Sequence, residues 1–308
     1  MIGTDYRAVA VAAAMTCSLI GCGDTAPSGS GGSGGTRGPD GPQTLGFVFS
    51  QLGFHLPEGR FAPANRNVSV DGFDLDGRAS TADNSQADEC AHDDYTGPNG
   101  ETGIDYRMLD LMDQIETFQP NNTIDSIAQA AITNGEMTGL MEVSGVNDMQ
   151  NDDDVQVQVF SSMDFPAVGA ASGVIPGGTL AAHPDDSLNS DVVSGRIEDG
   201  VLIVGPIDIV LDFNIQVVDL QLTINRSWIR VRLAADGQSG VGVFAGFWSV
   251  DEIITTIAVP TNWGAAIGST REEFEAGLAL ADGDYNGEIC ESISMMFDFE
   301  VVQAFIVK

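Results

Sequence analysis

The sequence predicts a mainly β fold of the α+β class, an antiparallel sandwich or open barrel with a helical hairpin and two short helices. Apolar and polar residues alternate with period two along most of residues 140–247 and again over 297–307, which is typical of strands with one wet face. A period near 3.6 is confined to residues 104–134 and to short stretches after Ser249 and Thr270. We therefore expect the helices to be few and the sheet to dominate.

One folded domain is expected over residues 44–308, a length that can bury a sizeable core. Its opening segment, residues 44–56, is aromatic and apolar, and indicates a first strand or a packed N-terminal segment. Residues 71–105 are acidic and turn-rich, with Arg78 as their one basic residue. This composition is too polar for core and predicts a long functional or ion-bound loop.

The helical hairpin is expected near residues 104–134. Apolar residues recur at helical spacing from Ile104 to Phe118, and Pro120 ends the pattern. A second helix is expected to begin at Thr123 and to end at Asn134, before a glycine suited to the left-handed conformation. The capping box that begins at Ser249 predicts the first of the two short helices.

The strands are expected to form an antiparallel meander. The expected strands are Leu140–Val146, Val155–Phe160, Ile197–Val204, Ile207–Val217, Val218–Asn225, Ile229–Leu233, Val241–Phe247 and Phe297–Val307. Asp152–Asp154 is interpreted as the turn between the first two. The alternation slips by one residue at Val217–Val218, and such a slip inverts the two faces, so we expect a bulge or a break there.

The N-terminal residues are expected to contain an export signal. The apolar run Ala8–Ile20 is too short to span a bilayer, but it suits the core of a signal peptide. It ends in Leu19-Ile20-Gly21-Cys22, which resembles the lipobox of bacterial lipoproteins. The resemblance implies that residues 1–21 are removed and that the Cys22 thiol carries lipid. The alternative is a signal peptide cut elsewhere, with Cys22 as a free thiol.

A tether is expected over residues 22–43, because their Gly/Ser-rich composition cannot bury apolar surface. A Gly-rich coil of about 18 residues has a root-mean-square reach of roughly 20 to 25 Å. The protein is thus expected to be exported and held at a bacterial membrane by lipid. Gly23, directly after the lipidated cysteine, favours the outer membrane in lipoprotein terms.

The charge of the chain limits its partners. The formal net charge is −33, from 45 acidic and 12 basic residues, and Lys308 is the single lysine. Nucleic acid is excluded as a partner, because its binding needs a basic footprint. Anionic membrane surfaces are repelled too, so the lipid anchor rather than charge is expected to hold the protein at a membrane. The sequence leaves open whether a further partner is a protein, a glycan or a small molecule.

Two cysteines remain once Cys17 has left with the signal peptide and Cys22 has taken lipid. In an oxidising exported compartment, Cys90 and Cys290 are expected to pair with each other. The chain-entropy model gives up to about 5 kcal/mol of stabilisation for a loop of that length. The alternative is two separate buried thiols.

Two acidic motifs point to calcium. The sequence Asp282-Gly-Asp284-Tyr-Asn286-Gly287 resembles the opening of EF-hand and dockerin calcium loops, and Glu288 follows as a further oxygen ligand. The twelfth position, however, is Ile293 instead of the bidentate Glu. The second predicted set of ligands is Asp71, Asp74 and Asp76, the last two in an Asp-x-Asp-Gly turn.

The two motifs are expected to meet. A disulfide between Cys90 and Cys290 would draw the acidic loop around residues 71–94 against the loop that begins at Asp282. Like charges brought together in this way repel each other, and a divalent cation is their natural neutraliser. We therefore expect a calcium-stabilised rim fastened by the disulfide.

Whether the protein is an enzyme is left open, with a non-enzymatic role favoured. The three histidines form no zinc-binding pattern, and the expected folded domain, residues 44–308, has no G-x-S-x-G elbow and no P-loop. The expected function is a structural or ligand-binding role for a membrane-anchored lipoprotein whose acidic loops are ordered by calcium. The alternatives are a secreted polysaccharide hydrolase with Asp/Glu acid–base chemistry and a carrier of apolar ligands.

Overall fold

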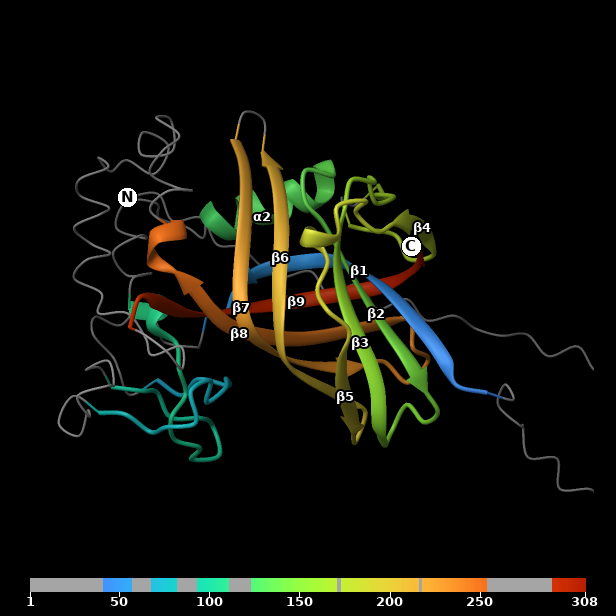
Figure 1. Cartoon of the computed structure of the whole chain (residues 1–308). Coiled ribbons are helices and arrows are strands. Elements are labelled where there is room, and N and C mark those ends of the chain that lie inside the picture. Colours follow the sequence, from blue (N-terminus) through green and yellow to red (C-terminus); the bar gives the residue numbers. More distant parts are fainter. Residues whose placement is uncertain are drawn as a thin grey trace, which may run out of the picture. The chain divides into compact units, whose positions relative to one another are not determined.

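A computed structural model describes residues 41–56, 68–81, 93–110, 123–170, 173–215, 218–253 and 290–308. All of them belong to one compact unit, Gly41–Lys308. Within them, eight strands form a closed antiparallel barrel in the order β1-β2-β3-β5-β6-β7-β8-β9, and β9 pairs back with β1 (Figure 1). The mainly β prediction is confirmed.

The barrel strands are β1 (Gln43–Phe54), β2 (Thr138–Val146), β3 (Asp152–Ser162), β5 (Val193–Glu198), β6 (Val201–Ile215), β7 (Val218–Leu233), β8 (Ser239–Ser249) and β9 (Ser292–Val307). A ninth strand, β4 (Gly178–Ala181), pairs in parallel with the end of β9. The other elements with described bounds are the helix α2 (Thr123–Asn134), which packs on β1, and the short 3-10 helix η1 (Asp186–Leu188).

The pairing of β1 with β9 joins the first and last strands of the sheet. Phe47 lies opposite Gln303, and the ladder continues to Phe54 opposite Phe297. Because these strands come from opposite ends of the described unit, nothing local in either segment signals that they are neighbours. The sheet is therefore a barrel, as one of the two predicted architectures has it, and the pairing closes it.

The helices agree with the sequence where the structure describes them. The second helix of the expected hairpin is α2, with the expected bounds. The first begins at Arg107 instead of Ile104 and is described as far as Asp110. The helix after Ser249 is described to Ile253, and the Ser249 Oγ accepts the Glu252 N–H at 3.5 Å. The remaining helical predictions lie outside the described residues.

Two strand predictions were wrong. The expected strand Ile197–Val204 is broken at Asp199–Gly200, where both residues have positive φ values, 51° and 76°. Two such residues form the tight connection between twisted antiparallel strands, so the segment is the hairpin of β5 and β6. Asp152–Asp154 was expected to be a turn but begins β3, and the turn lies just before it.

The slip of alternation at Val217–Val218 marks a hairpin. Ile215 lies opposite Val218, so β6 and β7 are the two arms, and residues 216–217 lie outside the described residues. The bulges are elsewhere: the registers shift around Gly205–Pro206 on β6 and around Arg226–Ser227 on β7. Each bulge changes the phase of its strand and keeps apolar residues inward on both sides of the irregularity.

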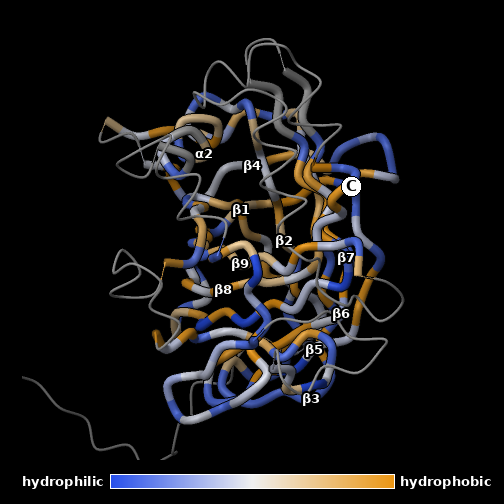
Figure 2. The backbone as a smooth tube through the Cα atoms, turned by 90° about the vertical axis from the view of Figure 1, so that its left-hand side faces the viewer, coloured by the Kyte–Doolittle hydropathy of each residue, from blue (hydrophilic) through white to orange (hydrophobic). Residues whose placement is uncertain are grey.

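Aromatic rings fill the barrel interior beside β9. Phe299 makes edge contacts with Phe49 and Phe244, with ring centroids 5.4 and 5.6 Å apart. Phe297 stacks between Phe244 and Phe54, at 5.1 and 4.7 Å. Figure 2 shows hydrophobic stretches along the strands and hydrophilic ones in the connecting loops. The interior at this level is thus occupied by the protein's own side chains.

A strap, defined here as residues 68–81 and 93–107, packs on the outer face of β9. The Arg107 N–H donates to the Ser294 Oγ at 2.7 Å, and the Tyr106 hydroxyl donates to the His55 carbonyl at 2.6 Å. Gly72 lies so close to Met296 that an added Cβ would collide with the methionine side chain. The strap therefore has a fixed place on the barrel wall, and it carries the acidic loop.

No helix in the described ranges combines the length and apolar character needed to cross a membrane.

Candidate metal centre

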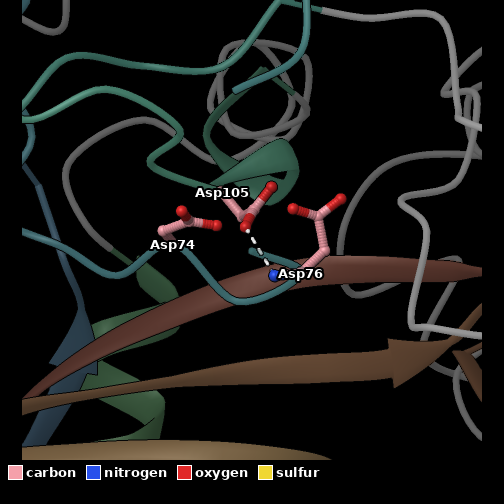
Figure 3. Close-up of side chains that lie close together, drawn as sticks. All are labelled: Asp74, Asp76 and Asp105. Atoms are coloured by element: carbon pink, nitrogen blue, oxygen red, sulfur yellow. Dashed lines mark hydrogen bonds between the residues drawn. The ribbon is translucent and has the colours of Figure 1, made fainter. Parts of the chain in front are cut away.

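Three carboxylates meet within the strap. Asp74, Asp76 and Asp105 each offer one oxygen, and these three oxygens lie within 4.8 Å of one another (Figure 3). Asp74 and Asp76 belong to the turn after Phe73, and Asp105 comes just before the helix that begins at Arg107. Asp105 is 3% exposed, whereas Asp74 is exposed and Asp76 is intermediate. The cluster therefore extends from the surface into the packed side of the strap.

Backbone hydrogen bonds hold Asp105 against the turn. Its N–H donates to the Phe73 carbonyl at 3.0 Å. Its Oδ2 accepts the Leu75 N–H at 2.6 Å and the Asp76 N–H at 3.4 Å. Two parts of the strap that are about thirty residues apart in sequence are thus joined by the residue whose carboxylate enters the cluster.

The conformation of the Asp-x-Asp-Gly turn is explained by the hydrogen bonds of its two aspartates. Asp74 Oδ1 accepts the N–H groups of Gly77 and Arg78 at 2.7 and 3.0 Å, and Asp76 Oδ1 accepts that of Arg78 at 2.8 Å. Aspartate commonly bonds backbone groups a few residues ahead in this way. Gly77 has φ = 81°, which a residue without a Cβ adopts readily. The turn presents its carboxylates toward Asp105.

The electrostatics of the cluster favour a cation. Carboxylates at this separation repel each other, and the repulsion is stronger for Asp105 because burial removes water from its surroundings. The backbone N–H groups offset part of this cost. Ca²⁺ takes six to eight oxygen ligands, among them Asp carboxylates, backbone carbonyls and water. Three converging aspartates are a suitable start for such a shell.

Asp71, the third ligand predicted in this loop, forms an ion pair with the barrel. Its carboxylate forms an ion pair with the Arg230 guanidinium on β7, at 2.5 Å, and that guanidinium lies 5.1 Å from the centre of the Phe73 ring. Asp71 thereby fastens the strap to the barrel. Of the three ligands predicted in this loop, Asp74 and Asp76 lie in the cluster with Asp105, and Asp71 is paired with Arg230.

Asp105 was not among the predicted ligands, because only the folded chain brings it next to Asp74 and Asp76. It lies between Ile104 and Tyr106, both buried, at the end of the acidic segment. A charged residue between two core residues is the sequence signal that could have identified it, because a charge is buried at low cost only when it is paired or hydrogen-bonded.

The second predicted calcium motif, Asp282, Asp284, Asn286 and Glu288, lies outside the described residues, as do the predicted lipidation site Cys22 and the predicted disulfide partner Cys90.

Cys290 is disulfide-bonded, and its partner lies outside the described residues. It precedes β9 by two positions, and the strap contacts that strand at Ser294 and Met296. The segment that contains Cys90 connects the two parts of the strap. This placement is compatible with a Cys90–Cys290 bridge, which stays a prediction.

Comparison of the chain with models of known protein families, with curated proteins and with solved structures finds no match.

Proposed function

We propose that this protein is an exported, lipid-anchored barrel with a structural or ligand-binding role, in which calcium orders the acidic strap. The observation that carries the calcium part is the convergence of Asp74, Asp76 and the buried Asp105 within 4.8 Å. The anchor part is supported by the lipobox at residues 19–22 and by the Gly/Ser-rich tether that follows it.

Calcium would act here as a cross-link. A cation held by Asp105 on one side and by the 74–77 turn on the other would join the two parts of the strap. It would also neutralise charge in a chain whose net charge is −33, where self-repulsion destabilises compact states. Ca²⁺ suits the site better than Mg²⁺, because Ca²⁺ tolerates irregular coordination and Mg²⁺ demands near-ideal octahedral geometry.

The test is thermal unfolding of the chain after EDTA treatment, with and without added CaCl₂. A ligand that binds only the folded state at 100 times its Kd stabilises that state by about 2.7 kcal/mol. We expect a calcium-dependent rise in Tm that is lost in Asp105→Asn and kept in the control Asp191→Asn, an exposed aspartate remote in sequence from the strap. Calcium-independent Tm values in the native chain would refute the calcium part.

Stoichiometry separates this site from the second motif. Isothermal titration with CaCl₂ should lose one site in Asp105→Asn. Asp282→Asn should lose a different one if the predicted loop at residue 282 also binds. If Asp282→Asn loses all calcium binding and Asp105→Asn binds as much calcium as the native chain, the strap is not the calcium site.

The anchor is tested independently of calcium. Mass spectrometry of the N-terminal peptide of the membrane fraction should show an acylated Cys22. The Cys22→Ser chain should carry no acyl group and should keep the uncleaved residues 1–21, which the mass of its N-terminal peptide reveals. An unmodified chain that begins elsewhere would refute lipidation and leave the calcium site unaffected.

A further inference from the structure

Large apolar side chains are exposed together near the end of β9. We call this set the apolar patch: Met163, Phe165, Val168, Ile175, Phe305 and Val307. Phe165 is 73% exposed and Met163 is 64% exposed. Single exposed apolar residues are ordinary on protein surfaces, but a group of them marks a surface that contacts something apolar.

Pairing and hydrogen bonds bring the members of the patch to one region. In the parallel pair of β4 and β9, Thr179 lies beside Phe305 and Ala181 beside Val307. The loop that carries Phe165 and Ile175 is attached to the same pair: the Gly177 N–H donates to the Gln303 carbonyl at 2.7 Å, and the Ala181 N–H to the Asp164 carboxylate at 2.6 Å. Figure 1 shows β4 next to the C-terminus.

Few charged residues lie in the segments that carry the patch: Asp164 falls between Met163 and Phe165, and Lys308 follows Val307. Residues 165–182 contain no Asp, Glu, Lys or Arg, and neither do residues 301–307. The acid at the edge of the patch, Asp164, accepts the backbone hydrogen bond from Ala181. The rest of the protein has high negative charge and repels anionic partners, whereas the patch presents apolar groups without that charge.

We propose that the apolar patch inserts into the interfacial region of a lipid bilayer whose headgroups carry no net charge. A second copy is the less favoured occupant, because two bodies with a formal net charge of −33 repel each other. Exposed Phe, Met and aliphatic side chains insert at the boundary between headgroups and acyl chains. The expected effect on headgroup preference is specific: negatively charged lipid should weaken binding.

The proposal rests on the proposed lipid anchor, which would bring the barrel close to a bilayer. The described unit begins at Gly41, 19 residues after the predicted lipidated cysteine. If the residues after Cys22 form the coil that their composition predicts, its root-mean-square reach of roughly 20 to 25 Å would keep the barrel near the bilayer. Even weak insertion would then occur at high effective concentration. The anchor would hold the protein at the membrane, and the patch would orient it there.

The test uses the chain from Gly23 onward, which lacks both the apolar signal segment Ala8–Ile20 and the acylated Cys22, so that neither contributes to binding. Vesicles of phosphatidylcholine should co-sediment this chain, and vesicles with phosphatidylglycerol should do so less. Replacing both Phe165 and Ile175 by Ser should weaken partitioning by about tenfold or more, because two large apolar groups no longer transfer from water. The matched control is Val192→Ser, which removes an apolar residue that is 56% exposed outside the patch.

A second readout remains valid if the double variant folds poorly. Bromine-labelled phosphatidylcholine should quench the added fluorescence of Phe165→Trp and leave that of Val192→Trp unchanged. Equal partitioning of patch and control variants, or equal quenching, would overturn the proposal. So would a concentration-dependent dimer that the Phe165 and Ile175 substitutions convert to monomer. Because acylation is absent from this chain, none of these outcomes depends on whether Cys22 carries lipid.

Discussion

The Lys308 ammonium lies 2.8 Å from Oε1 of Glu142, so the last residue of the chain is fastened to β2. The same ammonium donates to Gln158 Oε1 at 3.2 Å and lies 5.1 Å from the centre of the Phe160 ring on β3. The end of β9 extends beyond its pairing with β1 and instead contacts β4. The single lysine of this acidic chain thus anchors the strand that bears the apolar patch.

Lys308→Met should destabilise the protein by about 1 kcal/mol or less, because the ammonium is half exposed and water screens the ion pair. Urea unfolding of Lys308→Met, Glu142→Gln and the double variant measures the coupling free energy directly. We expect a coupling of about 0.5 kcal/mol at low salt that decreases as salt is added. A coupling of zero would mean that the contact contributes only packing.

Gly242→Ala should destabilise the barrel by about 1 to 3 kcal/mol, the usual cost of overpacking. A Cβ at Gly242 would collide with the Arg230 carbonyl oxygen, which belongs to the backbone of β7 and cannot rotate away. The matched control is Gly173→Ala, where a Cβ would meet nothing within 4 Å. Urea unfolding should show the loss for Gly242→Ala alone. Equal stability of the two variants would contradict the close approach of β7 and β8.

Tyr106→Phe tests the attachment of the strap. The buried Tyr106 hydroxyl donates to the His55 carbonyl at 2.6 Å and lies 3.2 Å from the Met296 carbonyl. Its removal should cost about 1 kcal/mol, because the part-buried His55 carbonyl loses this donor. If the strap supports the metal centre, the same variant should also weaken the calcium-dependent rise in Tm. Unchanged unfolding would show that the strap is held by its other contacts.

The strand content of this protein could be predicted from sequence, because one face of each strand is buried and the other is wet. The features that could not be predicted from sequence depend on contacts between distant segments. The partner of β1 is β9, and no residue of Phe47–Phe54 encodes that choice locally. The Asp199–Gly200 turn was not predicted although its two residues are typical of tight hairpins. The apolar residues on both sides of it were interpreted as one continuous strand.

The candidate metal centre was predictable only in part for the same reason. Asp74 and Asp76 are two positions apart and could be recognised as a carboxylate-rich turn. Asp105 joins them because the Phe73 carbonyl and the Leu75 N–H bond to its backbone and side chain. Asp71, equally acidic and closer in sequence, is directed to Arg230 by the packing of the strap on β7.

Asp152 provides a pH-dependent prediction. Hydrogen bonds lower its pKa below the ordinary value of 3.8. The largest cause is the Asn147 backbone N–H at 2.6 Å; desolvation opposes it, and the N–H groups of Asp154 and Asp148 add smaller lowering contributions. The folded state therefore favours the ionised carboxylate, which organises the turn between β2 and β3. The resulting stabilisation is fully present above the unfolded-state pKa and is lost as pH falls through the lower folded-state pKa.

Asp152→Asn keeps the shape of the side chain and removes its charge. At neutral pH it should be less stable than the native chain, and the difference should shrink as the pH falls through the lowered folded-state pKa, where the native carboxylate takes up a proton. The control is Asp153→Asn, the exposed neighbour, which should show a smaller difference at neutral pH. Urea midpoints of the three chains, taken as the pH is lowered, measure the effect. A difference between Asp152→Asn and the native chain that grows toward low pH would contradict the sign, because it would mean that the folded state prefers the protonated group.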